Sequence, residues 1–175
     1  MNEKELINYY NKFNEDKRLK TKHGRVEYLT AIKYIEDYLE DNDNILDIGA
    51  GTGAYSIYFY DKGYDVTSVE LVKHNLKVIE NNRPNLKAYQ GNAAHLSRFK
   101  DNSFDIIFLD PPYNQGIEEN ILEFFDNSNV LRKNGLIIVE ADINTDFSYV
   151  EKYSLELVRE KKYKTNKHLF FRKTL

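Results

Sequence analysis

Apolar and polar positions along the chain follow two alternating periods. Apolar side chains at spacings of three and four predict an amphipathic helix over residues 24–40. Its expected buried face is Val26, Leu29, Ile32, Ile35 and Leu39. Runs rich in apolar and β-branched residues predict strands at 45–48, 65–70, 86–90, 104–109 and 135–140. Helical patterns separate most of these runs, at 54–62, 72–83 and 117–125, which predicts βαβ units and a mainly parallel sheet.

The C-terminal end has a different pattern. Two β-rich runs, at residues 154–160 and 168–172, follow each other with no helical pattern between them, which predicts an antiparallel hairpin at one edge of the sheet. We therefore expect an α/β fold: a doubly wound, mostly parallel, seven-stranded Rossmann-like sheet with an antiparallel C-terminal edge hairpin. The 175 residues fit a single domain, 1–175, in which residues 1–40 form an N-terminal helical segment and a candidate lid.

Composition narrows the class of protein. Apolar content of 41% and charged content of 30% are typical of a soluble globular chain rather than a disordered one. The absence of cysteine excludes disulfides, thiolate metal sites and cysteine nucleophiles, and it fits a reducing, cytoplasmic location. The N-terminus lacks the apolar core of a signal peptide, and no apolar stretch is long enough to span a membrane. The four histidines show no metal-ligand spacing, so we expect no metal.

A glycine-rich loop follows the strand predicted at residues 45–48. The sequence Asp47-Ile48-Gly49-Ala50-Gly51-Thr52-Gly53-Ala54 has three alternate glycines between a strand and a helix. Glycines allow a sharp turn and the close approach of a ligand, and the helix start beyond them offers free N–H groups to a carboxylate, phosphate or ribose. The same string matches G-x-G-x-x-G/A, so a dinucleotide site and an ordinary turn both remain alternatives.

Two carboxylates accompany this loop. Glu70 ends the strand at 65–70, where a carboxylate can accept hydrogen bonds from both hydroxyls of an adenosine ribose. The alternative for Glu70 is a solvated acid at a strand end. Asp47 precedes the glycines and can accept from the ammonium of a methionine group. The alternative for Asp47 is a residue that caps the loop without touching a ligand.

The stretch ILDIGAGTGAYSIYFYDKGYDVTSVEL resembles the first two motifs of class I methyltransferases, which use S-adenosyl-L-methionine (SAM). With the edge hairpin included, the similarity covers most of the chain. The resemblance implies SAM as cofactor, with its methionine end lined by Asp47, Gly49, Gly51 and Gly53. It also implies that Glu70 holds the ribose and that Leu71 packs near the adenine. Asn92 and Ala93 lie where the family often has an acidic residue that contacts the adenine amino group.

The sequence Asp110-Pro111-Pro112-Tyr113 directly follows the strand predicted at 104–109, and the carboxyl ends of strands collect ligand chemistry in such sheets. An exocyclic amine of guanine or adenine is a poor nucleophile because its lone pair is delocalised into the ring. Asp110 and the Pro111 carbonyl can each accept one N–H bond and hold that nitrogen in line with the methyl donor. Pro111 and Pro112 fix the backbone, and Tyr113 can stack on the base. The alternative is a strand-ending turn with a packing tyrosine.

In the family, Asp-Pro-Pro-Tyr or Asn-Pro-Pro-Tyr marks enzymes that methylate planar amino groups. The segments SFDIIFLDPPYNQG, LRKNGLIIVE and VREKKYKTNKHLFFRK are similar to the bacterial ribosomal RNA guanine-N2 methyltransferases, over residues 97–175. Those enzymes carry a Phe where this chain has Gly49, and an Arg-Pro-Thr segment near the N-terminus that this chain lacks. The resemblance implies methyl transfer to guanine N2 in RNA.

The net charge of −3 gives no global case for nucleic acid, so any RNA contact must come from local basic clusters. One cluster lies near residues 17–25 and comprises Lys17, Arg18, Lys20, Lys22 and Arg25. The other lies near residues 161–173 and comprises Lys161, Lys162, Lys164, Lys167, Arg172 and Lys173. We weigh phosphate contact against a solvated face, or an edge hairpin that its lysines protect from aggregation.

The sequence thus predicts a SAM-dependent N-methyltransferase that acts on an exocyclic amino group of a base in RNA, with guanine N2 as the expected atom. The alternative acceptor is an amino group of a small molecule or a protein, which the pI near 5.9 favours. Two further alternatives are an NAD(P)-dependent oxidoreductase and a binding domain without activity. The Asp-Pro-Pro-Tyr motif argues against both of these.

Overall fold

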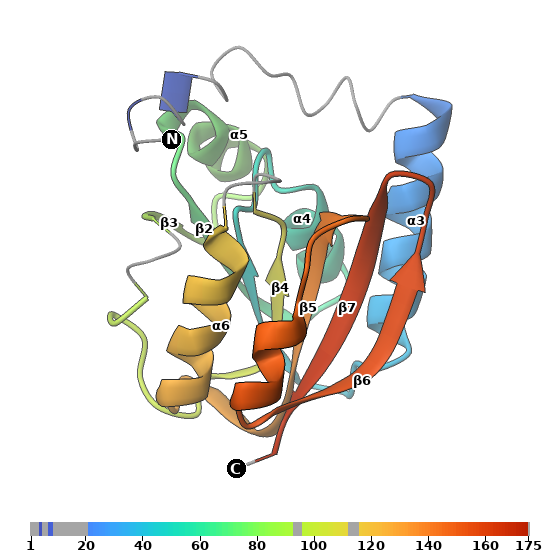
Figure 1. The fold of residues 1–175 in the computed structure, drawn as a ribbon. Helices are drawn as coiled ribbons and strands as arrows, with labels where there is room; N and C mark the ends of the chain where they lie inside the picture. The colour runs from blue at the N-terminus through green and yellow to red at the C-terminus, as the bar shows by residue number, and fades with distance from the viewer. Residues whose placement is uncertain (1–3, 5–6, 9–20, 93–95, 112–115, 175) are drawn as a thin grey trace.

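The computed structural model describes Lys4 and residues 7–8, 21–92, 96–111 and 116–174 (Figure 1). From residue 21 onward, its helices are α3 (Lys22–Glu36), α4 (Ala54–Asp61), α5 (Lys73–Asn82), α6 (Ile117–Asn127) and the 3₁₀ helix η1 (Ser148–Lys152). Its strands are β1 (Asn44–Ile48), β2 (Asp65–Glu70), β3 (Lys87–Gln90), β4 (Phe104–Leu109), β5 (Leu131–Asp142), β6 (Leu155–Lys162) and β7 (Asn166–Lys173). No described helix is long and apolar enough to cross a membrane.

The seven strands form one sheet in the order β3-β2-β1-β4-β5-β7-β6. Strands β1 to β5 pair in parallel, and β7 runs antiparallel between β5 and β6. This arrangement confirms the predicted fold class and the C-terminal edge hairpin. The strand order reverses between β1 and β4, and the crevice beyond the carboxyl ends of strands at such a switch point is where open α/β sheets bind ligands.

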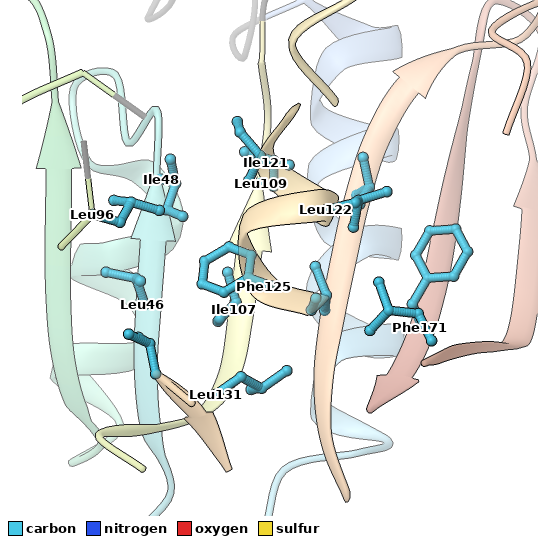
Figure 2. Packing of buried hydrophobic residues seen from close by; sticks show 14 of the residues in the cluster. Leu46, Ile48, Leu96, Ile107, Leu109, Ile121, Leu122, Phe125, Leu131 and Phe171 are labelled. Carbon is cyan, nitrogen blue, oxygen red and sulfur yellow. The ribbon is translucent and has the colours of Figure 1, made fainter. Parts of the chain in front are cut away.

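Helices cover the sheet on both faces. On one face, α6 lays Phe125 over Leu46 and Ile107, all of which are fully buried (Figure 2). On the other face, Ile35 from α3 and Phe59 from α4 join a second buried cluster. Because both faces are covered in this way, the strands are nearly continuous in apolar character, and the polar groups of interest lie in the loops at the strand ends.

The buried face of α3 differs from the predicted one. Val26 is 57% exposed and Leu29 is 50% exposed, so both lie outside the core, and the helix ends at Glu36 rather than at residue 40. Tyr28 instead faces the sheet side, and its hydroxyl donates to the Ala54 carbonyl at 3.0 Å. The fully buried side chains of the helix are Ala31, Ile32 and Ile35. A tyrosine can bury its ring while its hydroxyl keeps a hydrogen-bond partner. The helix is therefore rotated about its axis relative to the orientation predicted from its aliphatic residues alone.

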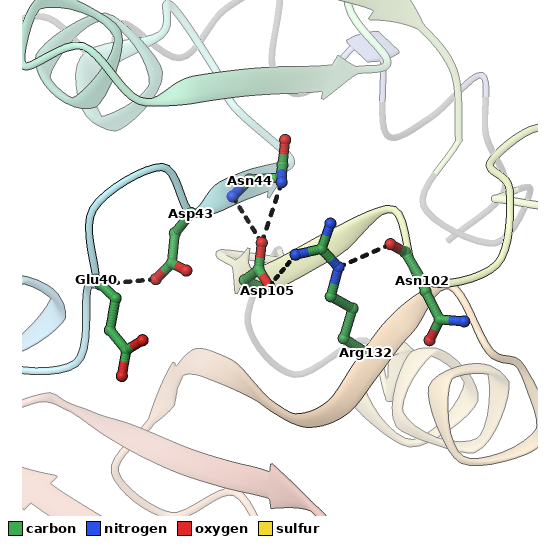
Figure 3. A network of polar contacts seen from close by, with 6 residues as sticks. All are labelled: Glu40, Asp43, Asn44, Asn102, Asp105 and Arg132. Carbon is green, nitrogen blue, oxygen red and sulfur yellow. Dashed lines mark hydrogen bonds and ion pairs between the residues drawn. The ribbon is translucent and has the colours of Figure 1, made fainter.

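A polar network joins the amino-terminal ends of β1, β4 and β5 (Figure 3). Asp105 accepts from the backbone N–H of Asn44 at 2.9 Å and from its side-chain amide at 3.1 Å. The other oxygen of Asp105 pairs with the Arg132 guanidinium at 2.7 Å, and Arg132 also donates to the Asn102 carbonyl. The network ties three neighbouring strand starts together and neutralises the Asp105 charge.

A buried lysine caps the C-terminal end of α6. Lys173, at the end of β7, is 4% exposed, and burial lowers the pKa of its ammonium group. The ammonium donates to the Phe125 carbonyl at 2.9 Å and to the Ser128 carbonyl. Carbonyl groups at a helix end have no partner within the helix and carry partial negative charge, so a cation there stabilises the helix.

We expect Lys173→Met to lower the free energy of unfolding by about 1–3 kcal/mol, because it leaves these buried carbonyls without a donor. Urea denaturation of the two proteins measures this difference. Lys162→Met, on the exposed part of β6, is the matched control and should change stability little. Equal midpoints for Lys173→Met and the unsubstituted protein would contradict the capping role.

Candidate functional site

The glycine loop leaves β1 and is fastened to the end of β2. Gly49 and Ala50 both donate their backbone N–H to the Val69 carbonyl, at 2.9 and 3.2 Å. All three glycines have positive φ, and Gly53 immediately precedes α4. The loop thus forms the strand–turn–helix element that its sequence predicts, at the carboxyl edge of the sheet.

The glycine loop also lies directly against the Asp-Pro-Pro-Tyr segment. Strands β1 and β4 are neighbours, and Asp110 donates its backbone N–H to the Ile48 carbonyl at 3.3 Å. Gly49 has φ of +78°, and a Cβ at this position would lie 2.9 Å from the Asp110 carbonyl oxygen. A side chain at position 49 would therefore push the two loops apart.

Glu70 is buried at the end of β2, with 6% of its surface exposed. One carboxylate oxygen accepts from the Gly51 N–H at 2.7 Å, and the other accepts from the Val72 N–H at 2.6 Å. Burial raises the pKa of this carboxyl, and hydrogen bonds from the backbone of Val72, Gly51 and Leu71 and from the Asn75 side chain oppose that shift. The alternative of a solvated strand-end acid is wrong, because Glu70 instead holds the glycine loop onto the end of β2.

Asp47 lies at the base of a buried chain of hydroxyl groups. Ser68 of β2 donates to Ser56 of α4 at 2.7 Å, and Ser56 donates to the Asp47 carboxylate. The three side chains are at most 2% exposed, and burial raises the pKa of Asp47 to about 6. A carboxyl with this pKa changes charge just below neutral pH. Sequence reasoning missed both serines; the only signal was a small polar residue at an expected buried position.

Four residues lie at the carboxyl end of β3 or beside it: Gln90, Gly91, Leu71 and Asn92. The Gln90 side chain donates to the Leu71 carbonyl at 3.2 Å, and Gly91 donates to the Glu70 carbonyl at 3.1 Å. Leu71 and Asn92 are half-buried. Leu71 and Asn92, which are predicted to lie near the adenine, therefore follow two neighbouring strands at the same edge as Glu70. Ala93 lies outside the described residues.

The structure describes the first half of the Asp-Pro-Pro-Tyr motif. Asp110 is half-buried and Pro111 is buried, directly after β4. Pro112 and Tyr113 lie outside the described residues, so the stacking role of Tyr113 stays a prediction. Within the described part of the chain, no three His, Asp or Glu side chains gather closely enough to hold a metal ion.

The basic cluster near residues 161–173 does not form one surface. Lys167 and Lys173 are 8% and 4% exposed, and Lys167 donates to the Thr145 carbonyl at 2.7 Å. Lys161 lies over the Tyr34 ring, with its ammonium 5.3 Å from the ring centre. Lys162 and Lys164 remain exposed. Of the cluster near residues 17–25, Lys22 and Arg25 are exposed, and Lys17, Arg18 and Lys20 lie outside the described residues.

Known proteins are similar to this chain in both sequence and fold. Residues 28–172 match the family model described as Conserved hypothetical protein 95. Over 120 residues, the chain is 28% identical to the ribosomal RNA small subunit methyltransferase D of Buchnera aphidicola, an alignment covering 65% of this chain and 62% of that one. The chain spans between 25% and 62% of the length of the curated relatives it matches.

Solved structures agree in the course of the backbone. A protein of Pyrococcus horikoshii superposes with a TM-score of 0.76 at 17% identity, over 96% of this chain and 99% of that one. The tRNA (uracil-54, C5)-methyltransferase of Pyrococcus abyssi, in complex with S-adenosyl-L-homocysteine, gives 0.65 at 15% identity, over 83% of this chain and 38% of that one. The chain has the fold of the class I SAM-dependent methyltransferases and belongs to the family described as Conserved hypothetical protein 95.

Proposed function

We propose that this protein is a SAM-dependent N-methyltransferase that modifies an exocyclic amino group of a base in RNA, with guanine N2 as the first candidate. The contact between the glycine loop and Asp110 is the observation that carries the proposal. Gly49 lacks a side chain where its Cβ would meet the Asp110 carbonyl oxygen at 2.9 Å. A donor held by the glycine loop and an acceptor held by Asp110 would therefore lie next to each other.

The residues at this edge fit SAM chemically. The Glu70 carboxylate accepts from the N–H groups of Gly51 and Val72, and the Asn75 side chain and the Leu71 backbone also donate to it. A carboxylate has about four acceptor sites, so two ribose hydroxyls would take the places of the Asn75 and Leu71 donors. Asp47 is a buried acid able to balance the ammonium of the methionine end. Leu71 and Asn92 would flank the adenine. When bound, SAM supplies a methyl group activated on a positively charged sulfur.

On the acceptor side, Asp110 and the Pro111 carbonyl would each accept one N–H of the amine. This holds the nitrogen toward the methyl donor and withdraws its lone pair from the ring, so that positioning and electrostatics supply the rate enhancement. The nitrogen gives up one proton when it gains a methyl group, and we assign that proton to the Asp110 carboxylate. Pro111 is buried, which keeps its carbonyl fixed.

RNA is the favoured acceptor because the Buchnera aphidicola relative bears the name of a ribosomal RNA methyltransferase. The second candidate is an amino group of a small molecule or a protein. The net charge of −3 and the burial of Lys167 and Lys173 favour this second candidate, since they reduce the positive surface open to phosphates.

Competition between acceptors tests the choice. The protein is incubated with methyl-labelled SAM and a mixture of protein-free ribosomal RNA, ribosomal proteins and small primary amines, and each fraction is then counted. We expect the label in the RNA fraction. Label in the protein or amine fraction alone would overturn the RNA assignment and keep the methyltransferase.

The pKa of Asp47 predicts how SAM affinity depends on pH. Asp47 must be ionised to pair with the ammonium, and burial raises its pKa to about 6. SAM affinity should therefore be highest near neutral pH and fall as the pH drops through about 6, because binding then requires the loss of a proton from Asp47. It should fall again above about pH 8, where the α-amino group of SAM loses its own proton. Equilibrium titrations from acidic to mildly alkaline pH measure this. The control is Asp47→Asn, which should bind more weakly near neutral pH and lose most of the decrease in affinity through about pH 6. An unaltered profile in this variant would remove Asp47 from the ligand.

A further inference from the structure

A groove of about 550 Å³ lies on the α6 face of the sheet, beside the edge strand β3. Its walls come from the starts of β1, β2 and β4, from β3, and from the segment that leads into β4. The lining residues are Asn44, Asp65, Thr67, Lys87, Tyr89, Arg98, Phe99, Lys100, Ser103 and Phe104. None of them belongs to the site described above.

The groove exists because the crossover from β3 to β4 has no helix among its described residues. On the same face, α6 covers β4 and β5, while residues 96–103 cover only part of β1 and β2. Leu96 is buried against the core and Phe99 packs on it. β2 is buried from Val66 to Glu70, whereas Lys87, Tyr89 and Gln90 of the edge strand β3 stay exposed.

The charge of the groove is positive. Lys87, Arg98 and Lys100 line it, and Asp65 is the lone acid among its lining residues. Asp65 is already paired with Lys87 at 2.6 Å. Arg98 and Lys100 are exposed and form no ion pair with the residues that the structure describes.

The carboxylates that adjoin the groove do not line it: Asp101, which directly follows Lys100, is not among the lining residues, and neither is Asp105. Asp105 adjoins the groove through Asn44, and its charge is taken up by Arg132 at 2.7 Å (Figure 3). Two positive charges therefore stay open to an anion.

Aromatic rings accompany the cations. The Arg98 guanidinium lies 4.8 Å from the centre of the Tyr89 ring, and Tyr89 is 40% exposed. Phe99 contacts Tyr89 edge-on at 6.3 Å and packs in the same way on buried Phe104 at 5.2 Å. An arginine on an exposed tyrosine, supported by half-buried Phe99 and buried Phe104, offers a stacking surface for a base beside a charge for a phosphate.

We propose that this groove binds a single-stranded segment of the RNA substrate, with its phosphates at Arg98 and Lys100 and a base at Tyr89. This inference rests on RNA being the acceptor. The groove runs from the amino-terminal ends of β1, β2 and β4 up to Tyr89, one residue before Gln90, which pairs with Glu70 in the sheet. Its Tyr89 end therefore lies next to the cofactor edge. From β3 to β4 is three strand spacings, about 14 Å, which a few nucleotides can span.

The test is an equilibrium binding titration with short single-stranded RNA of mixed sequence and with protein-free ribosomal RNA, repeated over a series of salt concentrations. Each phosphate contact contributes about 0.7 to the slope of log affinity against log salt for single strands. The variant Arg98→Gln/Lys100→Gln should lower that slope by about 1.4 and weaken binding about 10-fold or more. Tyr89→Ala should weaken binding about 5- to 100-fold with little change in slope. Both variants should retain SAM affinity, which shows that they are folded.

The matched control is Lys133→Gln/Lys152→Gln, which removes two exposed charges outside the groove. It should leave both slope and affinity close to those of the unsubstituted protein. If the Arg98/Lys100 variant binds RNA with unaltered slope and affinity while RNA is still methylated, the groove is not an RNA site and the proposed function stands. If the unsubstituted protein binds neither RNA, both the groove assignment and the RNA acceptor are overturned.

Discussion

Asp110→Ala should slow methyl transfer about 10²–10³-fold while SAM binds with nearly unchanged affinity. The carboxylate accepts an N–H bond that strengthens as the amine gains charge, so its loss raises the barrier without touching the cofactor. The backbone contacts of residue 110 survive the change, because the N–H bond to the Ile48 carbonyl does not involve the side chain. Single-turnover transfer of a labelled methyl group, with SAM saturating, measures the effect.

Asp110→Asn is the graded control for this prediction. An amide oxygen still accepts one N–H bond, and Asn-Pro-Pro-Tyr also occurs in the family that the motif resembles. We expect its rate to lie between those of Asp110→Ala and the unsubstituted protein. Full activity in Asp110→Ala would remove the side chain from the mechanism.

The second large effect is expected for Glu70→Ala. SAM affinity should fall by about 1.5–3 kcal/mol, the usual contribution of hydrogen bonds to a charged group. Two causes act together: the ribose hydroxyls lose their acceptor, and the N–H groups of Gly51 and Val72 lose theirs. Isothermal titration with SAM measures the loss, and a parallel titration with NADH checks that the pocket does not take a dinucleotide instead.

Glu70→Gln separates the two causes. The amide keeps one acceptor oxygen for a loop N–H but presents a donor at the other position, so binding should weaken by less than in Glu70→Ala. Urea denaturation without ligand reports the part of the effect that comes from the loop itself. Unaltered SAM affinity in Glu70→Ala would exclude Glu70 from the ribose site.

The sheet was predictable from the sequence because short runs rich in apolar and β-branched residues mark its strands. The runs at 45–48 and 104–109 are mainly apolar, and the run at 65–70 is rich in β-branched residues. All three are short, and all three are strands in the structure. The position of the site followed from one rule: neighbouring parallel strands present their carboxyl ends at the same edge. That rule brings Glu70 and Asp110 to the edge where Gly49 lies.

Sequence reasoning missed features that depend on the direction in which side chains point. From the sequence, the lysines of residues 161–173 were grouped as one basic cluster. However, alternate residues of a strand face opposite sides of the sheet, and β7 lies between two other strands. Lys167 and Lys173 share a covered side and are buried there. The packing of α3 through Tyr28 was missed for a related reason, because an amphipathic side chain was counted as polar.

Contacts between segments that are distant in the sequence produce no hydrophobic pattern there, so they were not predicted either. The approach of Gly49 to the Asp110 carbonyl depends on the backbone of two loops, and the hydroxyl chain to Asp47 depends on how α4 sits over β2. The groove beside β3 arises from a missing covering helix. It could have been suspected from the absence of a helical pattern between the strands at 86–90 and 104–109.

The most direct test of the central claim is label transfer to RNA. The protein and its Asp110→Ala variant are incubated with methyl-labelled SAM and protein-free, unmodified ribosomal RNA, and the RNA is digested to nucleosides and separated. The account predicts label in a base-methylated nucleoside, N2-methylguanosine first, at a rate at least about 100-fold lower with the variant. No label in the RNA while SAM binding is intact, or equal labelling by the two proteins, would contradict it.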